Sequence, residues 1–128
     1  GKKAGVLKGH SEQISDLEFS TNGKFLASSS FDTKARLWDL TALDSLGTFD
    51  NNGEFATAVA ISSNTELVAA GGADGHIRIW NAATEELLVI LEDHESAIMD
   101  FLFSPDGTML ISGSWNGAVR LWEVSGKE

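Results

Sequence analysis

The chain has 128 residues, no cysteine, and 19 acidic side chains against nine lysines and arginines, for a formal charge of −10. Such a length predicts one domain, and without cysteine neither disulfides nor zinc–thiolate sites can form. The acidity is opposite to the basic surface that nucleic acids or anionic membranes attract. No apolar run is long enough for a membrane helix, and no secretory signal pattern is present, which favours a cytoplasmic over a secreted location.

Three tryptophans recur at a constant interval. Trp38, Trp80 and Trp122 follow one another at steps of 42 residues, and His10 and His94 lie two such steps apart. A fixed period without insertions indicates a repeat architecture, in which each unit must stack on its neighbours to bury its apolar face. The chain therefore divides into repeats of about residues 1–40, 41–82 and 83–124, within one segment over 1–128.

Each repeat contains four short runs that are rich in Val, Ile, Leu and Phe and that predict β-strands. In chain order they cover residues 4–8, 14–20, 25–32, 35–39, 46–49, 87–91, 98–104, 109–116 and 118–124, with looser counterparts in the second repeat. The apolar alternation slips after Ile14 and again after Ile98, which predicts a bulge near the start of these runs.

Dipeptides that tolerate positive φ separate the runs and predict tight hairpins. They are Asn22-Gly23, Asp74-Gly75, Asp106-Gly107 and Asn116-Gly117. Gly71-Gly72, by contrast, falls inside a predicted strand, where the missing side chain is expected to relieve crowding against a neighbouring unit.

Four strands in each 42-residue repeat, a histidine near the front and a Trp-Asp pair such as Trp38-Asp39 at the end resemble the WD-repeat β-propeller family. The resemblance covers residues 6–124 and rests on several motif positions that recur together. It implies an all-β fold with three four-stranded antiparallel blades, whose strands are labelled a to d from the centre outward. The chain order is then d-a-b-c, three times over, with residues 4–8 as the first d strand.

The resemblance also implies a buried hydrogen-bonded tetrad in each blade. The expected members are His10, Ser28, Asp32 and Trp38 in the first repeat, Asp74 and Trp80 in the second, and His94, Ser112, Asn116 and Trp122 in the third. Because Asn52 and Ala70 replace the histidine and serine of the second repeat, its blade is expected to be held mostly by packing. Such networks stabilise a blade only when every member is satisfied.

His10, Ser28 and Asp32 are also the residue types of a hydrolytic triad. A serine that binds an indole N–H inside a blade is sequestered, and no oxyanion hole is evident, so catalysis is not expected. The clusters Asp93-His94-Glu95 and Asp74-Gly75-His76 contain metal-ligand types, but neither has a spacing such as His-x-x-x-His. No metal, no cofactor and no phosphate loop are therefore predicted.

A binding face is implied where the d–a loops, the starts of the a strands and the b–c turns meet. The face comprises Gln13, Ser15, Phe31, Phe55, Thr57, Ala73, Ala97, Met99 and Trp115. Phe31, Phe55 and Trp115 are candidate anchors for a peptide or protein, since central aromatic residues often carry binding energy. The alternative is that these rings pack across blade boundaries.

Three blades are too few to close a ring, since propellers have roughly four to eight blades. The simplest resolution is head-to-tail association, in which residues 4–8 of one chain complete the last blade of the next. Two chains would give six blades, which we prefer, and three would give nine. We therefore expect a non-enzymatic interaction scaffold that self-assembles; the alternatives are an engineered or minimal propeller without a ligand, or a three-blade fragment of a larger propeller.

Overall fold

The computed structural model describes residues 1–92 and 94–124, which form eleven β-strands. The strands are β1 (Ile14–Phe19), β2 (Phe25–Ser30), β3 (Lys34–Asp39), β4 (Asp44–Asp50), β5 (Ala56–Ile61), β6 (Leu67–Gly72), β7 (Ile77–Asn81), β8 (Leu87–Leu91), β9 (Ile98–Phe103), β10 (Met109–Ser114) and β11 (Val119–Glu123). These residues include no helix that is long and apolar enough to cross a membrane.

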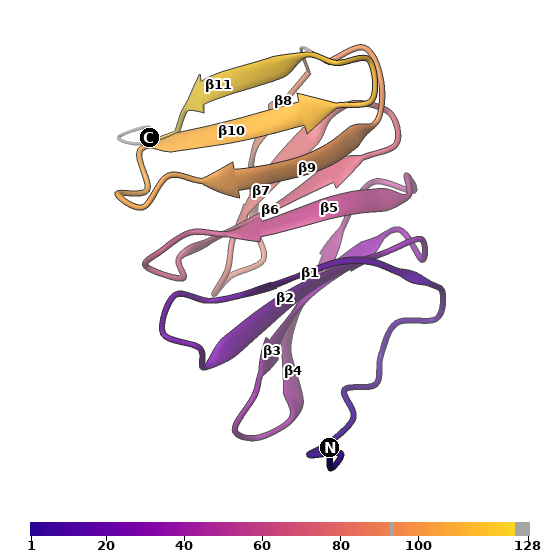
Figure 1. Ribbon diagram of the computed structural model, residues 1–128, viewed down its shortest axis with the longest axis vertical. Coiled ribbons are helices and arrows are strands. Elements are labelled where there is room, and N and C mark those ends of the chain that lie inside the picture. The colour runs from indigo at the N-terminus through magenta and orange to yellow at the C-terminus, as the bar shows by residue number, and fades with distance from the viewer. Residues whose placement is uncertain (93, 125–128) are drawn as a thin grey trace.

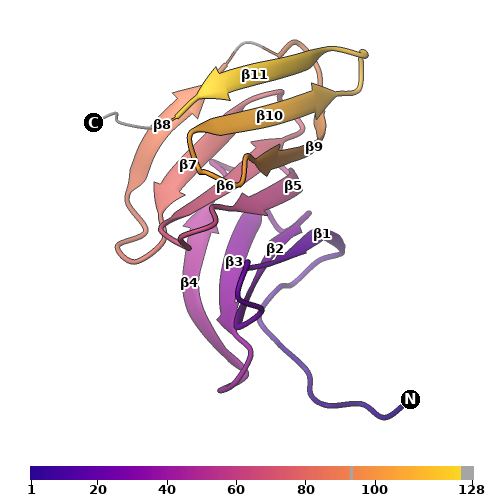
Figure 2. The same ribbon diagram turned by 60° about the vertical axis from the view of Figure 1, so that its left-hand side comes forward.

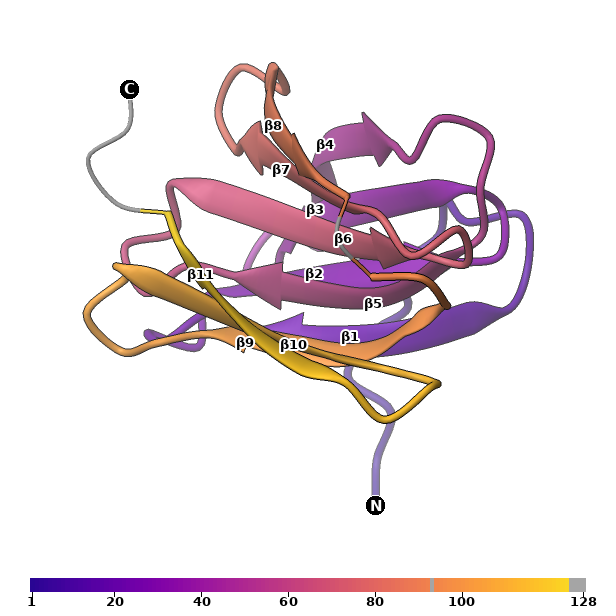
Figure 3. The same ribbon diagram turned by 90° about the horizontal axis from the view of Figure 1, so that it is seen from above.

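The strands form three antiparallel sheets, which correspond to the three predicted blades (Figure 1). The sheet orders are β1-β2-β3-β4, β5-β6-β7-β8 and β11-β10-β9. The innermost strands β1, β5 and β9 lie side by side, as the view from above shows (Figure 3). Blades one and two therefore have the expected four strands, whereas blade three has three within the described residues.

The strand expected over residues 4–8 does not form within the single chain. A strand needs a neighbour to satisfy its backbone N–H and C=O groups. The predicted neighbour, β11, lies at the far end of the row of blades, away from the amino-terminal segment (Figures 1 and 2). The remaining strands follow the predicted order of a to d in each repeat.

The predicted hairpins and bulges are confirmed. Gly23, Gly75, Gly107 and Gly117 all have positive φ, between 74° and 93°. Strand registers shift near the start of each inner strand, as between Ile14 and Asp16 in β1. The bulge lets the first residues of each a strand turn toward the loop end of the blade while the later ones keep the apolar alternation.

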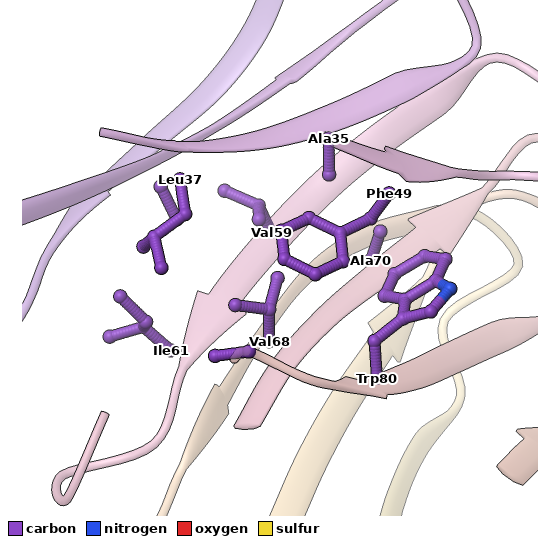
Figure 4. Packing of buried hydrophobic residues seen from close by; sticks show 10 residues of the cluster. Ala35, Leu37, Phe49, Val59, Ile61, Val68, Ala70 and Trp80 are labelled. Atoms are coloured by element: carbon purple, nitrogen blue, oxygen red, sulfur yellow. The ribbon is translucent and has the colours of Figure 1, made fainter. Parts of the chain in front are cut away.

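The core consists of two apolar layers, one at each blade boundary. The layer between blades one and two contains Ala27, Ala35, Leu37, Phe49, Val59, Ile61, Val68, Ala70, Trp80 and Ala82 (Figure 4). The layer between blades two and three contains Ala58, Ala60, Ala69, Ile77, Ile79, Ile98, Phe101, Phe103 and Leu110. The face of blade two that carries Trp80 packs on blade one, and the face that carries Ile77 and Ile79 packs on blade three.

Glycine at position 71 is needed for the second layer, as the sequence predicted. A Cβ added at Gly71 would lie 2.6 Å from Cβ of Ile98, closer than carbon atoms approach without displacement. The absent side chain lets β6 and β9 come together across the boundary.

Two carboxylates of β1 bind backbone amides of β5. Asp16 Oδ2 accepts the Val59 N–H at 3.1 Å, and Glu18 Oε1 accepts the Ile61 N–H at 2.8 Å. Burial raises the pKa of both Asp16 and Glu18, although these amides lower it in part, and the charge of Asp100 raises it further. The free edge of an inner strand is thus capped by side chains of the preceding blade.

Candidate functional site

The four tetrad residues of the first repeat form a continuous hydrogen-bonded chain. The Trp38 indole N–H donates to Ser28 Oγ at 2.8 Å, and Ser28 Oγ lies 2.7 Å from His10 Nε2. His10 Nδ1 lies 2.7 Å from Asp32 Oδ2, and the side chains of this pair are 6% and 5% exposed. Because a carboxylate only accepts, a neutral His10 donates through Nδ1 and accepts a hydrogen bond from the Ser28 hydroxyl at Nε2.

Asp32 is held in its ionised form by this environment. Burial alone would raise the pKa of the Asp32 carboxyl, but hydrogen bonds from His10 and from the backbone N–H groups of Ser11 and Lys34 lower it below the ordinary value of 3.8. The charged form therefore stabilises the folded blade, and this contribution is fully present only above pH 3.8. It disappears as the pH falls through the lower, folded value.

We expect Asp32→Asn to lower the free energy of unfolding by about 1.5–3 kcal/mol at neutral pH, the range for a hydrogen bond to a charged group. The deficit should shrink as the pH falls below 3.8, because the carboxyl is then protonated in both states of the parent protein. This difference in the free energy of unfolding is measured by urea unfolding of both proteins at several pH values, from neutral to strongly acidic. Asp16 and Glu18 are common to both proteins, so their titration cancels; a deficit independent of pH would contradict the prediction.

The third repeat uses a different partner for its histidine. Trp122 donates to Ser112 Oγ at 2.9 Å, and Ser112 Oγ lies 2.6 Å from His94 Nε2. On the other side of the ring, Nη1 of Arg120 lies 2.9 Å from His94 Nδ1. A guanidinium only donates, so Nδ1 accepts and Nε2 donates, which is the opposite tautomer to that of a neutral His10.

Asn116, which was expected in the third tetrad, is outside it. Its Oδ1 accepts the Ser114 hydroxyl and the Ala118 N–H and so closes the hairpin turn locally. Short polar side chains at turns commonly bind their own backbone in this way. The expectation for Asn116 was therefore wrong, and Arg120 is the residue that sequence reasoning missed.

The second repeat replaces the tetrad by an arginine network. Arg78, which is 3% exposed, donates to Asn51 Oδ1 at 3.2 Å and to Asp74 Oδ2 at 3.5 Å. Asn52, expected at the histidine position, is exposed because the chain turns there with a φ of 59° and directs Asn51 inward. Trp80 packs on Phe49 with ring centroids 5.5 Å apart. An arginine recurs at this position in every repeat, a period of 42 that could have revealed the network.

No metal site is built from these side chains. Within residues 1–92 and 94–124, no group of three or more His, Asp or Glu side chains could hold an ion. In the second repeat His76 Nδ1 lies 3.2 Å from Asp74 Oδ2, and that carboxylate also contacts Arg78, a competing cation. Asp93 of the other sequence cluster lies outside the described residues.

The predicted binding face lies at the loop end of the blades, where one backbone hydrogen bond recurs in each repeat. Phe31 N–H donates to Gln13 O at 3.0 Å, Ala73 N–H to Phe55 O at 3.0 Å and Trp115 N–H to Ala97 O at 2.9 Å. Six of the nine predicted residues are thus paired in space, two in each blade. The pairing follows from the bulge, which brings the start of each a strand beside the b–c turn.

Two further members of the face have a structural role between blades. Ser15 Oγ donates to Ala56 O at 2.6 Å, and Thr57 Oγ1 donates to Ile98 O at 2.5 Å. Each hydroxyl links its blade to the backbone of the next inner strand. Met99 stands at the same place in blade three and is exposed. Ser15 and Thr57 therefore join neighbouring blades, in addition to belonging to the predicted binding face.

The aromatic residues of this face differ in their surroundings. Phe31 stacks on Phe55 across the boundary between blades one and two, with centroids 5.0 Å apart and planes at 24°. Trp115, at the position of Phe31 in blade three, is 74% exposed. The stacked pair matches the packing alternative, although Phe55 keeps half of its surface exposed.

Comparison with known proteins agrees with this architecture. Among solved structures, the crystal structure of the RRP9 WD40 repeats superposes with a TM-score of 0.85 at 24% identity, over 94% of this chain, which shows a common fold. The chain spans 38% of the length of that protein. A family model described as WD domain, G-beta repeat, matches residues 1–39, 43–81 and 85–123. The chain therefore belongs to the WD-repeat family.

Proposed function

We propose that the chain is a non-enzymatic protein-interaction scaffold whose copies associate head to tail into a closed propeller. The observation that carries this proposal is the pair of apolar blade faces left open at the two ends of the row. Both reproduce surfaces that are buried at the internal boundaries. An open apolar sheet face of this kind is a typical site of association.

The open face of blade one matches the face that blade two buries against blade one. Leu17 and Phe19 are 58% and 66% exposed, whereas their counterparts Val59 and Ile61 are 1% and 6% exposed. The difference arises because blade one covers this face of blade two.

The open face of blade three matches the face that blade two buries against blade three. Val119 and Leu121 are 68% and 64% exposed, whereas their counterparts Ile77 and Ile79 are buried. Blade one of a second copy has the complementary residues for this face, because the same two surfaces already meet twice inside one chain. Two chains give six blades, within the usual range of propellers, and three give nine.

Two other arrangements would cover the same faces. Further blades of a longer chain could do so, since the chain spans 38% of the structure it resembles. Alternatively, the chain could be an engineered or minimal propeller, whose copies would cover these faces by assembling with one another but would bind no ligand. Head-to-tail association is preferred because it satisfies both faces with residues that the chain itself contains.

The partner of such a scaffold is proposed to be a peptide or protein that binds the loop end. Phe55 of blade two and Trp115 of blade three offer exposed aromatic surface there, and Met99 of blade three is exposed as well. Association of chains would repeat this face around the axis and bind a multivalent partner more tightly. Ser28, buried and bonded on both sides, offers no accessible nucleophile, which supports a non-enzymatic role.

Light scattering on a sizing column tests the association. We expect twice the chain mass for the parent protein, and the monomer mass for Leu121→Asp, because a charge on the open face of blade three cannot be buried without a partner. Thr21→Asp, in an exposed turn, adds the same charge and should leave the mass unchanged. A parent protein that is monomeric at every concentration would refute the association.

A further inference from the structure

The amino-terminal segment, residues 2–9, already lies where an outer strand packs at the internal boundary. A Cβ added at Gly5 would lie 2.6 Å from the Leu43 side chain. One repeat later, a Cβ added at Gly47 in β4 would lie 3.2 Å from the Glu85 side chain. Each pair is displaced from the other by the 42-residue period, so Gly5 sits against blade one as β4 sits against blade two.

A second pair of contacts places the end of the segment in the same way. A Cβ added at Gly9 would lie 2.9 Å from the Arg36 guanidinium. One repeat later, Asn51 accepts a hydrogen bond from Arg78 at 3.2 Å. The segment, although not a β-strand in the single chain, therefore lies against blade one in the place that β4 takes against blade two.

Within the described residues, blade three offers the complementary strand edge. Its strand β11 is an edge strand, whereas β3 and β7 are each paired on their outer side with β4 and β8. A groove of about 800 Å³ lies between blades two and three beside the carboxyl end of β11. Its lining includes the apolar side chains of Leu88, Val89 and Val124 and the acidic side chains of Glu66, Asp106 and Glu123.

The pairing inside the first two blades sets the register for a strand added to β11. In blade two, Ile77 of β7 lies opposite Leu91 of β8. Moved by the period, the same pairing puts Val119 opposite Leu7. Continued along both strands from the registers of blades one and two, it gives the pairs Ala118 with Lys8, Leu121 with Gly5 and Glu123 with Lys2.

We propose that residues 2–8 of one copy pair with β11 of a second copy in this register, which sets Lys2 beside Glu123 of the groove lining. At the corresponding place in blade one two acids, Asp39 and Asp44, face each other. The proposed register would instead set Lys2 opposite Glu123. Opposite charges on facing strands favour the pairing. The segment and β11 of one chain lie at opposite ends of the molecule, so the partner is a second copy (Figures 1 and 2).

This inference rests on the proposed head-to-tail association and specifies how the two chains are joined. Cysteine pairs test the register directly, because the chain has no cysteine of its own. In the variant Lys8→Cys/Ala118→Cys, both cysteines lie on exposed or half-buried sites and should form disulfides between chains. We expect covalent dimers on non-reducing gels, and none for the control Thr21→Cys/Ala118→Cys.

Charge exchange is a second measurement that needs no oxidation. Lys2→Glu should weaken association about fivefold, as for the loss of one exposed ion pair. The double variant Lys2→Glu/Glu123→Lys should restore it, and Lys24→Glu, which makes the same charge change in a distant turn, should have no effect. Sedimentation at several concentrations gives the dissociation constants.

The outcomes separate the two proposals. A parent protein of twice the chain mass whose Lys8→Cys/Ala118→Cys variant forms no disulfide would overturn the strand pairing and leave the blade-face association standing. Failure of the charge exchange to restore association would also overturn the register. A parent protein that stays monomeric would overturn both proposals, and the faces would then belong to further blades of a longer chain.

Discussion

Replacing Trp80 by alanine is expected to lower the free energy of unfolding by about 3–5 kcal/mol, the range for removing a large buried aromatic side chain. Trp80 is 3% exposed and packs on Phe49 in the layer that joins blades one and two (Figure 4). Trp80 is the largest side chain that blade two contributes to this layer. Urea unfolding followed by circular dichroism measures the loss.

Trp115→Ala is the matched control for this prediction. It removes the same side chain from a site that is 74% exposed, where substitutions usually change stability by less than about 0.5 kcal/mol. A loss below about 1 kcal/mol for Trp80→Ala would mean that the boundary between blades one and two is not a cooperative part of the core.

Replacing Gly75 by alanine is expected to lower the free energy of unfolding by about 2–5 kcal/mol, because two effects add. Gly75 has a φ of 85°, and a left-handed conformation costs an L-residue about 1–2 kcal/mol. The added Cβ would also lie 2.7 Å from His94 O and 2.9 Å from Ser96 O. Displacing packed backbone costs about a further 1–3 kcal/mol.

Gly23→Ala separates the two effects. Gly23 has a similar φ of 74°, and nothing lies within 4 Å of an added Cβ. Gly23→Ala should therefore lower the free energy of unfolding by about 1–2 kcal/mol, from conformational strain alone. The same urea unfolding experiment measures this decrease. Equal losses for Gly23→Ala and Gly75→Ala would show that the loop of blade three moves aside without cost.

Local features of the chain were predictable because they depend on neighbouring residues. The glycines of the hairpin turns and the bulge after Ile14 follow from backbone sterics and the two-residue period of a strand. The link of Trp38 through Ser28 to His10 also agrees with the expectation from the family resemblance.

Polar networks of the later repeats were not predictable in the same way. Asn116 has the residue type that could replace Asp32, yet its side chain bonds within its own turn and leaves the histidine to Arg120. In the second repeat Asn51 rather than Asn52 points inward, because the backbone turns at that site. A choice between neighbouring polar residues depends on local geometry, which periodicity does not contain.

By itself, the sequence determined the repeat length, the strand order and the type of blade, since a 42-residue period of apolar runs and turn residues has few other solutions. Only the tertiary structure decided which residues join the blades. Asp16 reaches the amide of Val59, and Phe31 stacks on Phe55, because strands distant in sequence come together when the apolar layers close. Phe19 and Leu121, by contrast, stay exposed on the outer faces of the first and last blades that the structure describes.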